Sequence, residues 1–144
     1  MSRTSLRGFV ALTVALGLLL AAGTVEAQKT KGKSRPSTTK YLMAGISQPH
    51  CKALGDELKK SGPSDDKTWD KAACHAAVLN ELSYLLMDDG RCPDAAWAGA
   101  VKSLREGSAA ALRAAKEKDL TAAKAAFKEV TQGCAACHKA HKES

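Results

Sequence analysis

From residue 41 onward, apolar residues recur at the spacing of α-helices and never alternate for long in the manner of strands. The turn formers Gly62-Pro63, and Gly90 with Pro93, mark two breaks in this pattern. Asp94 and Asp119 stand where a side chain caps the start of a helix. The pattern therefore predicts four helices, over residues 41–61, 66–88, 94–117 and 120–141.

The last two predicted helices carry apolar stripes in which successive members are three or four residues apart. The stripe of the third helix is Trp97, Val101, Leu104, Ser108, Ala111 and Ala115, and that of the fourth is Leu120, Ala123, Phe127, Val130, Cys134 and Cys137. This is the seam spacing of helices packed at a shallow angle. Because the connections are short, neighbouring helices should run antiparallel. The expected fold is all-α, an antiparallel four-helix bundle over residues 41–144.

The first forty residues have a different character. Arg3 and Arg7 precede an uncharged, mostly apolar run over 8–25, and Val25 and Ala27 form a small-x-small cleavage pattern. These three zones predict a secretory signal peptide over 1–27, although a retained membrane anchor is the alternative. Cleavage would release the chain to a bacterial periplasm, with no stable membrane insertion. Residues 28–40 are basic and polar, which predicts a flexible linker.

Composition and charge narrow the possible functions. The net charge of the chain is +7, but residues 41–144 hold 15 basic and 14 acidic side chains, so the excess belongs to the N-terminal forty residues. Nucleic-acid binding, which needs basic residues on a folded face, is not expected. No glycine-rich phosphate loop is present, which argues against a nucleotide enzyme. Only 4% of residues are aromatic, so the core is thin and a bulky cofactor could fill it.

The motif that points to a function is Cys134-Ala135-Ala136-Cys137-His138, which reads CxxCH near the end of the fourth predicted helix. In an exported protein this is the attachment pattern of c-type haem. The two thiols add to the vinyl groups of the porphyrin, and the adjacent histidine supplies an axial nitrogen to the iron. We expect one covalent haem c, bound through Cys134 and Cys137, with His138 as the proximal ligand. Gly133, just before the first thiol, has no side chain, which would let the porphyrin approach closely there.

Three other interpretations of these residues compete with haem. Cys134 and Cys137 could form a disulfide or a redox-active CxxC, although the latter normally opens a helix after a strand. Cys134, Cys137, His138 and His141 could bind zinc, although structural zinc usually draws on two separated pairs. A partial echo of the motif ends in Cys74-His75, but Lys71 stands where the first thiol belongs, so a second haem is not expected. Export, CxxCH and helical periodicity together favour a single haem.

The chain resembles the class II c-type cytochromes, of the cytochrome c prime type. The resemblance rests on Lys118-Asp119-Leu120, Ala125-Ala126-Phe127, Val130, the CxxCH motif and Trp97. It is strong towards the C-terminus and loose over the first two helices. Members of this family are four-helix bundles with haem near the C-terminus, so the resemblance implies a periplasmic haem protein with the same anchors and proximal ligand. His141 and Lys142 stand where the family usually has tyrosine and arginine.

The sixth coordination position separates two functions within this family. Some relatives leave it open beside an apolar side chain and bind gases, whereas low-spin relatives fill it with a methionine of the first helix and transfer electrons. Two alignments with the family put either Ile46 or Cys51 at this place. The residues themselves offer Met43, our first choice, and His50 as the alternative, because thioether and imidazole groups both ligate haem iron. Pro49 should kink the helix near 45–48.

These residues predict an exported monohaem cytochrome that carries single electrons and turns over no substrate. The alternative is a gas-binding haem protein for nitric oxide or carbon monoxide. The partners of the predicted cytochrome would be periplasmic redox proteins, and a homodimer is compatible with the family. Of the remaining thiols, Cys51 and Cys74 fall at similar heights on the first two helices, which is compatible with a disulfide between them in an oxidising compartment, and the sequence leaves their pairing open. Cys92 is then left over.

Overall fold

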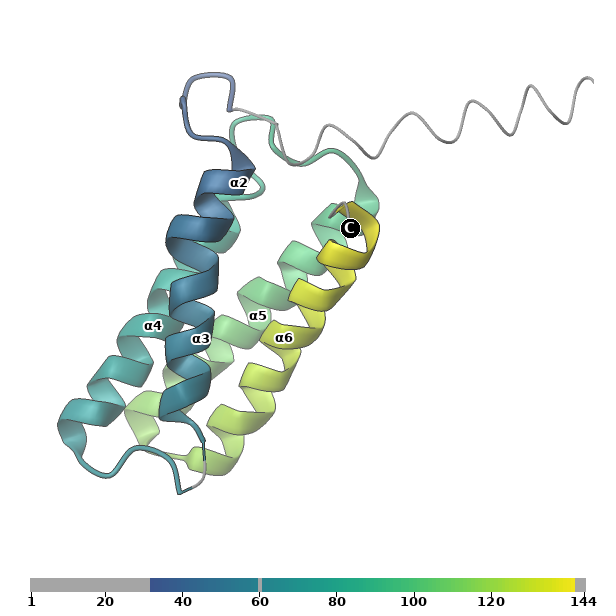
Figure 1. Ribbon diagram of the computed structural model, residues 1–144. Coiled ribbons are helices and arrows are strands. Elements are labelled where there is room, and N and C mark those ends of the chain that lie inside the picture. The colour runs from purple at the N-terminus through teal and green to yellow at the C-terminus, as the bar shows by residue number, and fades with distance from the viewer. Residues whose placement is uncertain (1–31, 60, 142–144) are drawn as a thin grey trace, which may run out of the picture.

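A computed structural model describes residues 32–59 and 61–141, and Figure 1 shows its arrangement. The described part is all-α, and the predicted signal peptide and its cleavage site lie outside it. In chain order the elements are α2 (Thr39–Leu42), the π-helical turn η1 (Met43–Ser47), α3 (Gln48–Glu57), α4 (Asp66–Leu85), α5 (Ala95–Glu117) and α6 (Leu120–His141). The first three are continuous and form the first helix of the bundle.

The four helices pack in the order of the chain: α3 lies on α4, α4 on α5, and α5 on α6. Successive helices run in opposite directions, as Figure 1 shows. The prediction of a helical bundle is therefore confirmed. The helices of the structure follow the predicted ranges closely, except that the first begins at Thr39 and ends at Glu57, and α4 ends at Leu85. No helix in the described residues has the length and apolar character needed to cross a membrane.

Aspartates at the helix starts explain where three helices begin. The Asp65 carboxylate accepts a hydrogen bond from the Thr68 amide at 2.8 Å, and the Asp65 amide donates to the Thr68 hydroxyl oxygen at 3.2 Å, which completes a capping box. Asp94 accepts from the Trp97 amide at 2.8 Å, and Asp119 accepts from the amide of residue 122 at 2.9 Å. Both predicted caps are present, and each satisfies an amide that has no partner within the helix.

The predicted stripes of α5 and α6 lie in the core. All six members of the α5 stripe are buried, and in α6 Ala123 and Val130 are buried while Cys134 and Cys137 are half-buried. Gly107 and Gly133 bring the two backbones together. A Cβ on Gly107 would lie 2.9 Å from the Val130 nitrogen, and one on Gly133 would lie 2.8 Å from the Ala100 oxygen. Gly133 therefore serves helix packing on α5, which corrects the expectation that it makes room for a porphyrin.

The first helix is interrupted where a kink was expected. Residues 43–47 form a π-helical turn in which the Gln48 amide reaches back to the Met43 carbonyl. Pro49, which has no backbone amide to donate, follows as the second residue of α3. A π turn contains one more residue than an α-helical turn, so it changes which side of the helix the neighbouring residues face. Here it lies in the segment that faces α6.

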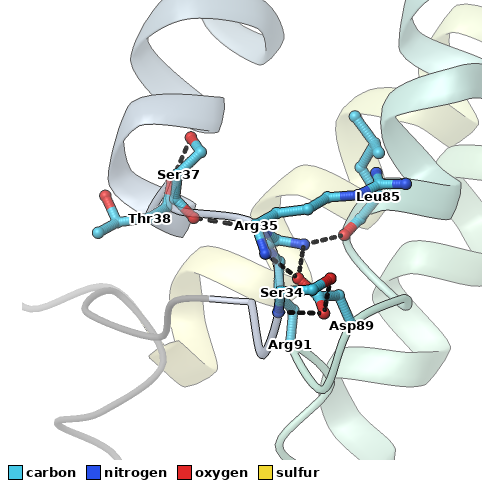
Figure 2. Close-up of polar contacts among 7 residues, drawn as sticks. All are labelled: Ser34, Arg35, Ser37, Thr38, Leu85, Asp89 and Arg91. Carbon is cyan, nitrogen blue, oxygen red and sulfur yellow. Dashed lines mark hydrogen bonds and ion pairs between the residues drawn. The ribbon is translucent and has the colours of Figure 1, made fainter.

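The chain before α2 is held against the α4–α5 connection, as Figure 2 shows. Asp89 accepts hydrogen bonds from the Ser34 and Arg35 amides at 2.9 and 3.0 Å. Arg91 is 1% exposed and donates to the carbonyl oxygen of Ser37 at 3.2 Å. These contacts fix the start of the first helix within the stretch 28–40 that the sequence presents as a linker, and they set the place from which α2 enters the bundle.

Candidate functional site

A cavity of about 760 Å³ lies between the first helix and α6. The first helix contributes residues spaced four apart, which places them on one face. These are Met43, Ser47, Cys51 and Gly55, and Lys59 lines the cavity just beyond the end of α3. The opposite wall comes from α6 through Phe127, Cys134, Cys137, His138 and His141, and α5 adds Trp97. The cavity occupies the place where a bundle packed on all sides would bring its first and last helices together.

The three residues of the CxxCH motif that carry chemistry all line this cavity. Cys134 and Cys137 are half-buried, whereas His138 is exposed on α6. Because positions 134, 137 and 138 lie within little more than one helical turn, one face of α6 presents both thiols and the imidazole. A bulky cofactor could therefore be held at three points by a single helix.

The two candidates for the sixth ligand occupy different places. Met43 is half-buried in the π turn and lines the cavity. His50 lies outside the set of lining residues, and its Nδ1 is 3.0 Å from Nδ1 of His75 on α4. The two rings meet edge to face with centroids 5.1 Å apart. The structure thus brings Met43 to the cavity and engages His50 between α3 and α4.

The structure does not contain the disulfide between Cys51 and Cys74 that the sequence allows. All five cysteines are free in the structure, and Cys74 is exposed on α4. Cys51 instead faces the cavity and makes a side-chain hydrogen bond with Cys134. The two thiols were expected at a similar height, but they point in different directions around their helices. His50 and His75, their neighbours in sequence, make one of the contacts between α3 and α4.

The hydrogen bond between Cys51 and Cys134 shifts the pKa values of the two thiols in opposite directions. It lowers the pKa of Cys51 to about 7, against the opposing effect of burial. It raises the pKa of Cys134, as does burial, because Cys134 keeps its proton to donate it. The pKa of Cys137 is also raised, first by burial and then by the negative charge of Asp94. Cys51 is therefore the most readily ionised of these three thiols.

His141 is a site residue whose role the sequence did not reveal. It is 7% exposed, its ring meets that of Trp97 edge to face at 5.4 Å, and its Nε2 is 3.5 Å from Oδ1 of Asp94. Trp97 in turn donates its indole N–H to the Leu86 carbonyl at 2.8 Å. The signal was present in the spacing, because residues 130, 134, 137 and 141 continue the core stripe of α6 to its last turn.

The zinc interpretation finds no support in the geometry. In the described part of the chain, no three His, Cys, Asp or Glu side chains are grouped so that they could hold a metal ion. Comparisons with protein families, with curated proteins and with solved structures found no match.

Proposed function

We propose that this protein is an exported, monohaem c-type cytochrome that carries single electrons and turns over no substrate. The observation that carries the proposal is that both thiols and the histidine of a CxxCH motif line one cavity of about 760 Å³. Pockets for cofactors and small molecules commonly measure about 300–1,000 Å³. The donor set and the space therefore fit haem c.

Each wall of the cavity has a separate task in this proposal. Cys134 and Cys137 would hold the porphyrin through thioether bonds, and His138 would ligate the iron from α6. The bound iron would supply one-electron redox chemistry. Met43 comes from the opposite wall and is the candidate for the sixth ligand. Trp97 and Phe127 bring large apolar surfaces to the cavity, and so restrict water around the redox centre.

The outer edge of the cavity suggests how partners would be met. Lys40, Lys52 and Lys59 line it and are exposed. Lys52 and Lys59 also make ion pairs with Asp56. Exposed lysines at the edge of a redox site favour periplasmic redox partners with an acidic surface, because complementary charge speeds their encounter.

The test is production of the full chain in a bacterium with a working c-type maturation apparatus. Intact-mass spectrometry of the exported protein should show one added haem that survives denaturation. The double variant Cys134→Ser/Cys137→Ser is the control and should show only the polypeptide mass. A polypeptide mass for the unchanged sequence would overturn the proposal.

The absorption spectrum of the same sample separates electron transfer from gas binding. The thioether of Met43 at the cavity favours a filled sixth position, which predicts low-spin bands that carbon monoxide changes little. High-spin bands that shift on addition of carbon monoxide would instead assign the gas-binding alternative.

A further inference from the structure

The cavity contains a third thiol that the CxxCH motif does not account for. Cys51 of α3 lines the same cavity as Cys134 and Cys137, and all three are half-buried. Its side chain is hydrogen-bonded to Cys134 across the space between the first helix and α6. One of the two proposed haem anchors thus has a neighbouring thiol from another element.

Cys51 offers Cys134 a disulfide partner on another helix, whereas Cys137 lies on the same helix. A disulfide needs Cβ atoms about 3.5–4.5 Å apart, whereas residues three apart on a regular helix have Cβ atoms about 5–6 Å apart. Cys134 and Cys137 lie within the regular helix α6, so a bond between them would distort a helical turn. Cys51 lies on α3, so a bond to it would not have to close within one helical turn.

We propose that Cys51 and Cys134 form a disulfide in the chain before haem is attached, and that this bond withholds one anchor from thioether formation until it is reduced. The role in attachment rests on the proposed function, whereas the bond itself rests only on the positions of the two thiols. The bond would also tie α3 to α6 across the cavity.

The oxidation is written with a small-molecule disulfide, such as oxidised glutathione, as the electron acceptor. The Cys51 thiolate attacks one sulfur of the disulfide and releases one glutathione thiolate. The Cys134 sulfur then loses its proton, attacks the mixed disulfide at Cys51, and releases the second. Two protein thiols are oxidised, one small disulfide is reduced to two thiols, and the two protein protons end on the glutathione. The lowered pKa of Cys51 favours the first attack.

The test begins with the exported full chain made without the maturation apparatus. The protein is incubated under native conditions with oxidised glutathione, its remaining thiols are blocked, and it is digested with trypsin without reduction. Cleavage after Lys and Arg leaves Cys51, Cys74 and Cys92 in three different peptides, and Cys134 shares a fourth with Cys137. Mass spectrometry should find peptide 41–52 joined to peptide 129–139.

Variants with single substitutions then identify which two sulfur atoms form the cross-link. The cross-link should persist in Cys137→Ser and disappear in Cys134→Ser and Cys51→Ser. Cys74→Ser is the matched control, because it removes an exposed thiol from α4 and should leave the cross-link unchanged. A bond between Cys134 and Cys137, or blocked free thiols at both Cys51 and Cys134, would overturn the proposal.

A second measurement concerns attachment. In the maturing host, growth under more oxidising conditions should lower the fraction of chains that carry haem, and Cys51→Ser should abolish that dependence. Equal dependence in both proteins would overturn the proposed role. If no variant ever gains haem, the proposed function fails while the cross-link result stands. If haem is attached and no cross-link forms, only this inference fails.

Discussion

Single residues decide which chemistry the cavity can support. The two proposed haem anchors and His138 could be placed from the sequence because CxxCH is a contiguous motif whose spacing suits the vinyl groups of a porphyrin. Cys51 and His141 could not be assigned in the same way. Their roles depend on which side of a helix faces the cavity, and a one-residue change of rotation there moves a side chain by about 100°. The π turn before Cys51 introduces such a change.

At the thiol pair, Cys51 should react at lower pH than an ordinary cysteine. In the chain without haem, its rate of alkylation by iodoacetamide should follow a pKa of about 7, because Cys134 donates a hydrogen bond to its thiolate. The measurement is a pH–rate profile of each cysteine peptide by mass spectrometry. In Cys134→Ala the profile of Cys51 should move towards the ordinary value of 9.0. The same profile in both proteins would contradict the assigned hydrogen bond.

At the sixth position, Met43 should matter and His50 should not. In the haem-loaded protein, Met43→Ala should convert low-spin bands to high-spin bands and permit carbon monoxide binding, because it removes the thioether that lines the cavity. His50→Ala should leave the bands unchanged, since His50 meets His75 instead. The check is the absorption spectrum of each variant. Low-spin bands in Met43→Ala together with their loss in His50→Ala would reverse the assignment.

Helices and their contacts are the level at which the sequence is most informative. Periodicity, turn residues and aspartate caps locate α4, α5 and α6 to within a few residues, because those signals are local. The first helix is less well defined in the sequence. Its start at Thr39 depends on distant partners, since Asp89 and Arg91 hold the chain just before it. The close approach of α5 and α6 is likewise a property of two helices together.

The close approach predicts opposite effects for two glycines. Gly133→Ala should lower the free energy of unfolding by about 1–3 kcal/mol, because a Cβ there would lie 2.8 Å from the Ala100 oxygen and would force the helices apart. Gly99→Ala is the control in α5. No atom lies within 4 Å of its Cβ position, so the change should raise stability by about 0.5–1 kcal/mol through helix propensity. Urea unfolding followed by circular dichroism measures both, and similar effects of both substitutions would contradict the packing role.

The whole molecule combines a tightly packed pair of helices with a less constrained first helix. The all-α class followed from the helical periodicity of the sequence, and the antiparallel packing of successive helices followed from the short connections. The cavity did not, because it results from how far the first helix stands from α6. The contact between His50 and His75 is one of the links that set this position.

Mild acid should destabilise the protein through this link. The pKa of His75 is lowered from 6.5, first by burial and then by the charge of His50, so the unfolded chain binds the proton more readily. Stability should therefore fall as the pH drops below about 6.5, and His75→Gln should reduce that slope. Cys74→Ser is the control with the ring retained. Urea unfolding at pH 7.5 and 5.5 tests this, because the lowered pKa values of Asp56, Asp65 and Asp89 act only at lower pH. Cys51, whose pKa is lowered to about 7, also titrates in this range, but it does so in both variants and cancels from the difference between their slopes. Equal slopes in His75→Gln and the control would contradict the prediction.

The packing of the helices in chain order has a consequence for assembly. Both proposed anchors belong to α6, which is braced by α5, while the facing wall is fastened chiefly to α4. A porphyrin could enter the folded polypeptide if the first helix moved away from α6, while α5 and α6 stayed packed on each other. Such a protein would not need to fold around its cofactor and could bind it after folding.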